Sequence, residues 1–395
     1  MNITQQVASL PPYGNGTLPA GIRSRTIDNN NGLMVHVLEA GFETPGRPCL
    51  LLLHGFPELA YSWRKVMRPL AAAGYHVIAP DQRGYGRTTG WDGSYDADGD
   101  PFRILNMVRD ATGLVYALGY RSVAGIAGHD AGSPVASWCA LVRPDVFPKV
   151  ALMSSPFPGP PAIPFNTANG GAPPRRAPTD DELDAELAKL PRPRKYYHNH
   201  QRLRGANDDM LHAPQGLHAF FRAYYHYKSA DWKENKPHPL KSRTAEEIAK
   251  IPTYYVMDRD KGMAETVAPF IPSAAEIARC KWLTDAEVGV YVTEYSRTGF
   301  TGALQGYRVR RGNDPKTISE LRTFSGRAID VPACFIAGKS DWGSYQTPGA
   351  LEAMQSTVCT DWRGTHFVDG AGHWVQQEQP EATSKLLLEF FSGAR

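Results

Sequence analysis

The stretch that most constrains the fold runs from residue 123 to residue 132. Residues 123–127 are small and apolar, as expected of a strand buried on both faces of a parallel sheet. They lead into Gly-His-Asp-Ala-Gly at 128–132, and a helical segment follows directly. A Gly-x-nucleophile-x-Gly pattern between a strand and a helix is typical of a sharp turn that presents a nucleophile, because larger residues than glycine would collide there. The pattern therefore predicts that Asp130 is a nucleophile.

An aspartate in this position predicts a different chemistry from the serine found in esterases and lipases. A serine needs a base to remove its proton, whereas a carboxylate is already an anion at pH 7 and can attack carbon directly. Attack on an sp³ carbon gives an alkyl ester of the enzyme. An activated water must then hydrolyse that ester, so a general base is also required.

Composition indicates an ordinary soluble globular protein. The chain has 395 residues, of which 42% are hydrophobic and 21% charged, and this length suits one large domain with an insertion or two domains. A formal net charge of +3 without a basic run argues against nucleic acid as a partner. We find no apolar run of 18 residues and no signal-peptide pattern, so we expect no membrane span.

The five cysteines are widely spaced and odd in number, which predicts buried, reduced thiols and a cytoplasmic location. No Cys/His pair has the spacing of a metal site, so we expect neither a metal ion nor a cofactor. The sequence excludes neither a monomer nor a homodimer.

Predicted strands and helices alternate in both end portions of the chain, which is typical of an α/β protein with a mostly parallel sheet. Between them the chain becomes rich in proline, helical and aromatic, and no strand alternation is evident. We therefore predict a catalytic domain formed by 1–155 and 326–395, and a helical cap formed by 156–325. Strands are predicted at 24–27, 33–39, 49–53, 76–79, 123–127, 150–153, 331–337 and 365–368, and the main helices at 62–73, 104–118, 180–190, 216–228, 244–251, 273–279, 285–298, 351–356 and 379–391.

Two further residues complete a candidate catalytic triad. Asp341 and His373 each follow a predicted strand, and active residues of a parallel sheet gather at those strand ends. His373 would activate water, and Asp341 would orient the imidazole. Asp361 and Asp369 are rivals of Asp341, but one precedes the last strand and the other lies in the same turn as His373.

Donors for a developing negative charge are predicted from the loop that follows the third strand. The backbone N–H groups of Phe56 and Ala131 would bind the oxyanion. Turn chemistry suggests a cis peptide bond at Pro57. We expect Pro57 and Trp342 to contribute to the substrate site.

Taken together, the motifs resemble those of the epoxide hydrolases in the α/β-hydrolase superfamily. They are His-Gly-Phe-Pro-Glu at 54–58, Tyr-Ser-Trp-Arg at 61–64, Asp-Gln-Arg-Gly-Tyr-Gly at 81–86, Gly-His-Asp at 128–130 and Gly-His-Trp at 372–374. The resemblance implies an eight-stranded, mostly parallel sheet with the cap inserted after the sixth strand, and a small hydrophobic epoxide as substrate. It also implies two cap tyrosines that protonate the epoxide oxygen.

For the first of these acids the resemblance of residues 283–308 points to Tyr307. For the second, Tyr224 reproduces a family Tyr-x-x-Tyr spacing with Tyr227, while Tyr225, Tyr254 and Tyr255 stay open. A phenol with a pKa of about 10 is a suitable acid for an alkoxide leaving group.

The chain departs from the family at two positions, where Ala131 replaces a tryptophan and Ser133 a glycine. Loss of an indole N–H beside the nucleophile argues against a haloalkane dehalogenase, although a dehalogenase stays an alternative. A biosynthetic hydrolase or cyclase with the same triad is another, and a non-catalytic receptor is a third.

Overall fold

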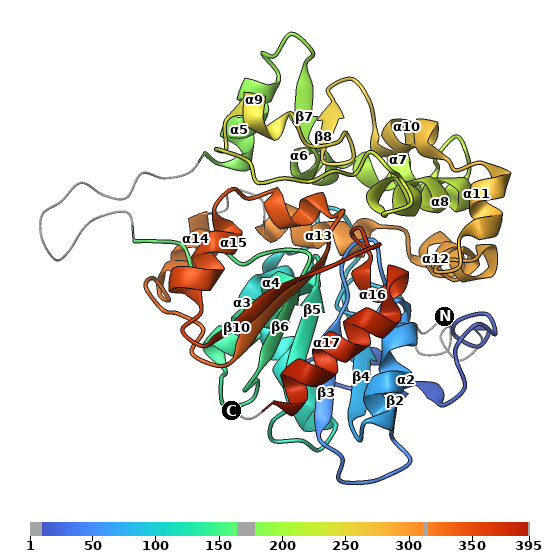
Figure 1. Cartoon of the computed structure of the whole chain (residues 1–395), viewed down its shortest axis with the longest axis vertical. Coiled ribbons are helices and arrows are strands. Elements are labelled where there is room, and N and C mark those ends of the chain that lie inside the picture. Colours follow the sequence, from blue (N-terminus) through green and yellow to red (C-terminus); the bar gives the residue numbers. More distant parts are fainter. Residues whose placement is uncertain (1–9, 164–177, 311–314, 394–395) are drawn as a thin grey trace, which may run out of the picture.

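The computed structural model describes residues 10–163, 178–310 and 315–393, and a single eight-stranded sheet lies at its centre (Figure 1). The strand order is β1-β2-β4-β3-β5-β6-β9-β10, in which β1–β2 and β2–β4 pair antiparallel and the other neighbours pair parallel. The predicted fold class is confirmed. The strands are β1 Ile22–Asp28, β2 Met34–Ala40, β3 Cys49–Leu53, β4 His76–Pro80, β5 Gly125–His129, β6 Val150–Met153, β9 Ala333–Gly338 and β10 Trp362–Val368.

Helices cover both faces of this sheet, which explains why its central strands are apolar throughout. On β3, Leu50 and Leu52 belong to one hydrophobic cluster, whereas Leu51 and Leu53 belong to another. The first cluster includes side chains of α2 (Arg64–Ala72) and α17 (Pro380–Ser392). The second includes side chains of α3 (Ile104–Ala117) and α4 (Gly132–Val142). Successive side chains of a strand point to opposite faces, so every position of β3 is buried.

Between β6 and β9 the chain forms a mainly helical insertion, as expected, and Figure 1 shows it in green to orange over the upper edge of the sheet. The expectation that it holds no strand is wrong, because β7 (Arg194–Tyr196) and β8 (Val256–Asp258) pair antiparallel. Strands of three residues are too short to show an alternating pattern. The domain boundaries at 155/156 and 325/326 stay predictions. The helices of the insertion are α5 Asp180–Leu187, α6 Tyr197–Gln201, α7 Ala206–Leu211, α8 Leu217–Lys228, α9 Ala245–Ile248, α10 Met263–Val267, α11 Ala274–Arg279, α12 Asp285–Thr298, α13 Thr301–Arg310 and α14 Pro315–Arg322.

Element ends differ from the sequence-based ranges by a few residues. The strand β5 begins at Gly125 and ends at His129, two residues later than predicted at both ends, because its ladder bonds to β3 and β6 begin there. All five thiols are free and four are buried, but Cys280 is only half-buried. The remaining helices are α15 Ala350–Ala353, which continues as a π-helical turn at Met354–Val358, and α16 Val375–Glu378; the 3₁₀ turns lie at Ala60–Trp63, Asp100–Phe102, Ala268–Phe270 and Trp342–Tyr345.

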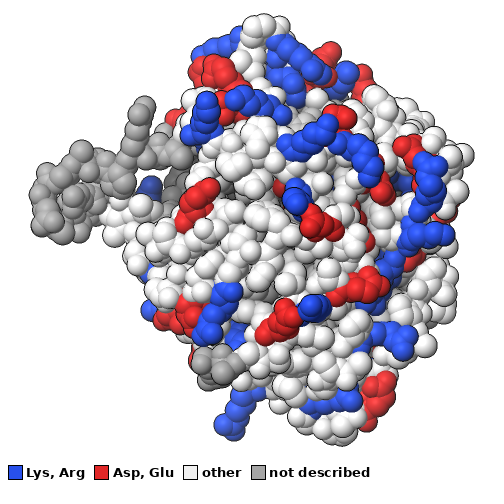
Figure 2. Space-filling view, viewed as in Figure 1, with Lys and Arg blue, Asp and Glu red and all other residues white. Residues whose placement is uncertain are grey.

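No helix within the described ranges has both the length and the apolar character needed to span a bilayer. Acidic and basic side chains are interspersed on the face drawn in Figure 2, so that face carries no broad patch of one sign.

The elbow between β5 and α4 gives a first prediction. A Cβ on Gly128 would lie 2.2 Å from the carbonyl oxygen of Gly132, a backbone atom that cannot move aside. We expect Gly128→Ala to lower the free energy of unfolding by about 1–3 kcal/mol, the usual cost of forcing extra atoms into a packed site. Gly289 is a matched control on α12, because a Cβ there meets nothing within 4 Å. Gly289→Ala should raise stability by about 0.5–1 kcal/mol. Urea unfolding followed by circular dichroism compares the two variants, and equal effects would contradict this reading of the elbow.

Candidate active site

The elbow holds Asp130 in a backbone conformation that few residues other than glycine adopt. Its φ is +48°, and its N–H donates to Met153 O at 3.0 Å. The side chain points at the end of β3, where Phe56 N donates to Asp130 Oδ1 at 2.9 Å. Gly55 permits this approach, because a Cβ there would lie 2.5 Å from Asp130 Cβ.

The imidazole of His373 lies between two carboxylates. His373 Nε2 is 3.3 Å from Asp130 Oδ2, and His373 Nδ1 is 3.0 Å from Asp341 Oδ1. Gly343 N also donates to Asp341 Oδ1 at 2.7 Å, which fixes that carboxylate. Nδ1 of the ring thus faces Asp341, and Nε2 faces Asp130. The structure therefore places the three predicted triad residues in one line of contacts.

The two rivals of Asp341 lie elsewhere. Asp361 forms an ion pair with Arg363, and Asp369 forms one with Lys339, both at the surface. Neither carboxylate contacts the imidazole. The choice of Asp341 by its position after a strand agrees with this placement.

Opposing effects act on the Asp130 carboxylate. Burial alone would raise its pKa, but the hydrogen bond with His373 and the nearby positive charges lower the pKa below its ordinary value. The side chain is therefore anionic at neutral pH. An anionic carboxylate is the state that nucleophilic attack requires.

Sequence reasoning missed the buried groups that hold the histidine loop. His129 Nε2 donates to His373 O at 2.7 Å, and His129 Nδ1 contacts Glu58 Oε2 at 2.6 Å. Burial opposes charge on both side chains, but their mutual attraction lowers the pKa of Glu58 and raises that of His129. Both residues occur in motifs quoted above, although those motifs do not indicate that the two side chains meet.

A second carboxylate, at the end of α16, binds the same loop. Glu378 accepts backbone N–H groups from Gly372 and Trp374, each at 2.9 Å, and from Ala230 at 2.8 Å. It thus fixes both neighbours of His373 and ties the loop to the insertion. Burial raises the pKa of Glu378 to about 8, against the three backbone donors.

A cavity of about 450 Å³ opens above Asp130 and Ala131. It runs along α4 and beneath the insertion. Asp180, His198 and Arg243 contribute polar groups to its wall, but many of the lining residues are aromatic or proline. Among them are Pro134, Trp138, Pro156, Phe157, Pro158, Tyr196, Tyr197 and Tyr307. The chamber suits an apolar small molecule whose reactive carbon reaches Asp130.

Tyr307 and Tyr197 both line this chamber, and their ring centroids are 6.1 Å apart. Tyr307 also packs edge-on against Phe56 at 5.3 Å. Burial raises the pKa of the Tyr307 phenol well above its ordinary value, and the charges of Tyr197 and Asp130 add to that effect. Tyr307 therefore keeps its proton at neutral pH. Tyr197 was not among the sequence candidates.

The other tyrosine candidates are placed differently. Tyr224 is buried near Asp130, whose charge contributes, after burial, to a raised pKa, but Tyr224 is not among the residues that line the chamber. Tyr225 donates to Pro57 O at 3.3 Å, and Tyr254 donates to Asn235 Oδ1 at 2.7 Å.

Tyr255 has its ring centroid 6.3 Å from that of His373, and its hydroxyl has no hydrogen-bond partner among the described residues.

The remaining predicted residues also differ in whether they lie at the chamber. The Phe56–Pro57 peptide bond is cis, as expected, and Ala131 lies at the start of α4 beside the chamber. Trp342 does not line the chamber but is buried, and its ring packs edge-on against His238 at 4.9 Å.

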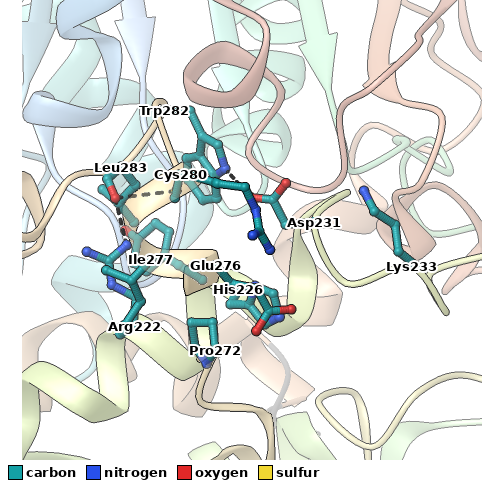
Figure 3. Close-up of a pocket in the computed structure, with 12 residues that line it drawn as sticks. Arg222, His226, Asp231, Lys233, Pro272, Glu276, Ile277, Cys280, Trp282 and Leu283 are labelled. Carbon is teal, nitrogen blue, oxygen red and sulfur yellow. Dashed lines mark hydrogen bonds between the residues drawn. The ribbon is translucent and has the colours of Figure 1, made fainter. Parts of the chain in front are cut away.

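A second cavity, of about 220 Å³, lies within the insertion between α8 and α11 (Figure 3). Two hydrogen bonds join residues of its wall. Arg222 donates to Leu283 O, and Trp282 donates to Asp231 Oδ2. None of the triad residues lines this cavity.

Comparison with known proteins gives the family. The model of the alpha/beta hydrolase fold matches residues 48–380. The chain belongs to the α/β-hydrolase family. Epoxide hydrolase B of Mycobacterium tuberculosis is 30% identical to this α/β hydrolase over 368 residues, which cover 93% of this chain and 98% of that protein. The AB hydrolase superfamily protein YfhM of Bacillus subtilis is 40% identical over 371 residues, which cover 92% and 96%.

Solved structures agree with these sequence matches. An epoxide hydrolase from an endophytic Streptomyces superimposes on this α/β hydrolase with a TM-score of 0.73 and 29% identity, covering 95% of this chain and 96% of that one. The potato (Solanum tuberosum) epoxide hydrolase I gives a TM-score of 0.68 at 26% identity, covering 94% and 99%. The chain is thus an epoxide hydrolase-like member of the family.

Proposed function

We propose that this protein hydrolyses an epoxide to a vicinal diol through a covalent ester at Asp130. The contact that carries the proposal is His373 Nε2 at 3.3 Å from Asp130 Oδ2, beneath a chamber whose walls include the phenols of Tyr307 and Tyr197. A serine-type hydrolase would need that imidazole to deprotonate its nucleophile. Here the nucleophile needs no base, so the imidazole is available for water.

In the first half of the reaction, Asp130 Oδ2 attacks one epoxide carbon and the carbon–oxygen bond of the ring breaks. The oxygen that leaves takes a proton from Tyr307 or Tyr197. An alkoxide is far more basic than an ordinary phenolate, so a protonated phenol is a suitable acid for this oxygen. Asp130 Oδ1 stays bound to Phe56 N and becomes the carbonyl oxygen of the ester.

In the second half, His373 Nε2 takes a proton from a water molecule, and the resulting hydroxide attacks Asp130 Cγ. The tetrahedral intermediate places its negative charge on Oδ1, which already accepts the Phe56 N–H at 2.9 Å. We assign the Ala131 N–H as the second donor. Asp341 stabilises the imidazolium. As the intermediate collapses, the leaving alkoxide takes the remaining proton of the added hydroxyl, which releases the diol and restores the Asp130 carboxylate, and the imidazolium proton returns to the tyrosinate.

The proposal is tested by measuring formation of the ester and its hydrolysis separately. His373→Gln should still form the ester but hydrolyse it slowly, so the protein mass should rise by the mass of one styrene oxide, on the peptide that contains Asp130. Asp130→Asn should form no adduct and lose about 10⁴-fold or more in kcat. His212→Gln, a change at an exposed histidine, is the control and should turn over normally. Intact-protein mass spectrometry makes the measurement, and an adduct on Asp130→Asn would contradict the role of Asp130.

The tyrosine assignment is tested by the rate of adduct formation. Tyr307→Phe and Tyr197→Phe should each slow this step by about 10²-fold, because each removes an acid that contacts the leaving oxygen. Tyr224→Phe should slow it by less than about tenfold, since Tyr224 is not among the residues that line the chamber. Rapid-quench kinetics with styrene oxide gives the three rates. A large loss in Tyr224→Phe together with a normal rate in Tyr197→Phe would transfer the second acid to Tyr224.

A further inference from the structure

Helix α8 ends in a lysine that is almost completely enclosed. Lys228 is 2% exposed, and its Nζ lies over the faces of four aromatic rings. Among the described residues no carboxylate lies within ion-pair distance of this Nζ. The distances from Nζ to the ring centroids are 4.5 Å for Tyr255, 5.2 Å for Tyr224, 5.2 Å for Trp374 and 5.9 Å for Tyr254.

An enclosed ammonium without a paired carboxylate is costly, and aromatic faces compensate only part of the lost hydration. Methionine or leucine would fill the same space without that cost. The position of the charge therefore calls for a functional explanation.

Lys228 is joined to the catalytic histidine through the backbone. Its carbonyl oxygen accepts the N–H of His373 at 2.9 Å, and one of its four rings belongs to Trp374, the next residue along. A Cβ on Gly372 would lie 2.6 Å from Lys228 O, so the two segments are in close contact. The ammonium is thus held beside the His373 loop.

The charge is also placed among the carboxylates of the site. Asp130, Asp341 and Glu58 all act on the ammonium, and Lys228 in turn helps to lower the pKa of Asp130. Glu58 is already neutralised by His129, which it contacts at 2.6 Å. The titratable groups around Lys228 come from several elements. Asp130, Asp341 and Glu58 act on its charge, Tyr224, Tyr254 and Tyr255 lie beneath its ammonium, and His373 is joined to it through the backbone.

The charges of the triad indicate how the Lys228 ammonium acts on His373. Asp130 and Asp341 carry two buried negative charges on either side of one imidazole, at 3.3 and 3.0 Å. Esterification removes the charge of Asp130, but Asp341 stays anionic beside the imidazole throughout ester hydrolysis and, without another cation, would draw a proton onto the ring. A protonated imidazole cannot accept a proton from water, so ester hydrolysis would stop.

We propose that Lys228 is a positioning residue whose ammonium supplies the missing positive charge and so keeps His373 neutral and able to act as the base. This inference rests on the proposed function. Burial lowers the pKa of Lys228 to about 8, although the neighbouring carboxylates raise it in part. The ammonium is therefore mostly charged at pH 7 and loses its charge as the pH rises through about 8.

The test compares full-length wild type with Lys228→Met, Lys228→Gln and Lys228→Arg on styrene oxide between pH 5.5 and pH 9. Rapid-quench mass spectrometry follows formation and hydrolysis of the Asp130 adduct separately. In Lys228→Met and Lys228→Gln the midpoint of the acid limb of hydrolysis should rise by about one pH unit, so hydrolysis well below the wild-type midpoint slows by up to about tenfold. Lys228→Arg keeps the charge and should keep the wild-type midpoint. Above pH 8.5 wild type has lost the same charge, so the rates should converge.

A purely structural lysine gives a different result. Hydrolysis would then slow by the same factor at every pH, with the midpoint unchanged, and that result would overturn the inference. Circular dichroism checks the fold of each variant, and the glutamine variant provides the measurement if the methionine variant does not fold. A wild type that forms no adduct with any epoxide would instead contradict the proposed function, and the inference with it.

Discussion

Two carboxylates lie within 3.3 Å of one imidazole in the interior of this protein, and the rest of the structure is arranged around that contact. The sheet brings the three groups together, because Asp130, Asp341 and His373 follow β5, β9 and β10 at one edge. Two buried negative charges on either side of one ring are tolerated only with compensating donors and cations. The Phe56 N–H, the Gly343 N–H and the ammonium of Lys228 are those compensating groups.

The catalytic domain and the insertion divide the proposed chemistry between them. The sheet edge holds the nucleophile, the base and the oxyanion donor on short, tightly bonded loops. The insertion holds the acids, Tyr307 on α13 and Tyr197 on α6, and also the cation at the end of α8. Glu378 joins the two parts, because it binds N–H groups of the His373 loop and of Ala230. A shift of the insertion would therefore disturb both the acids and the charge of the site.

The sequence predicted those residues of the candidate site that belong to local patterns. Asp130 is marked by the glycines around it, and Asp341 and His373 by the strands that precede them. No local sequence pattern points to Tyr197 or Lys228. Tyr197 begins a five-residue helix without periodicity, and a lysine at a helix end is usually exposed. Their roles depend on Tyr307, Tyr255 and Trp374, which tertiary packing alone brings to them.

The claim that an enzyme carboxylate performs the displacement is tested most directly by a single turnover in H₂¹⁸O, with enzyme in excess over epoxide. Hydrolysis of an ester at Asp130 transfers an oxygen of the enzyme to the diol and leaves the solvent oxygen in the carboxylate. The first diol should therefore contain no ¹⁸O, and the peptide with Asp130 should carry the label. Label in the first diol, with an unlabelled Asp130, would show that water attacks the epoxide directly.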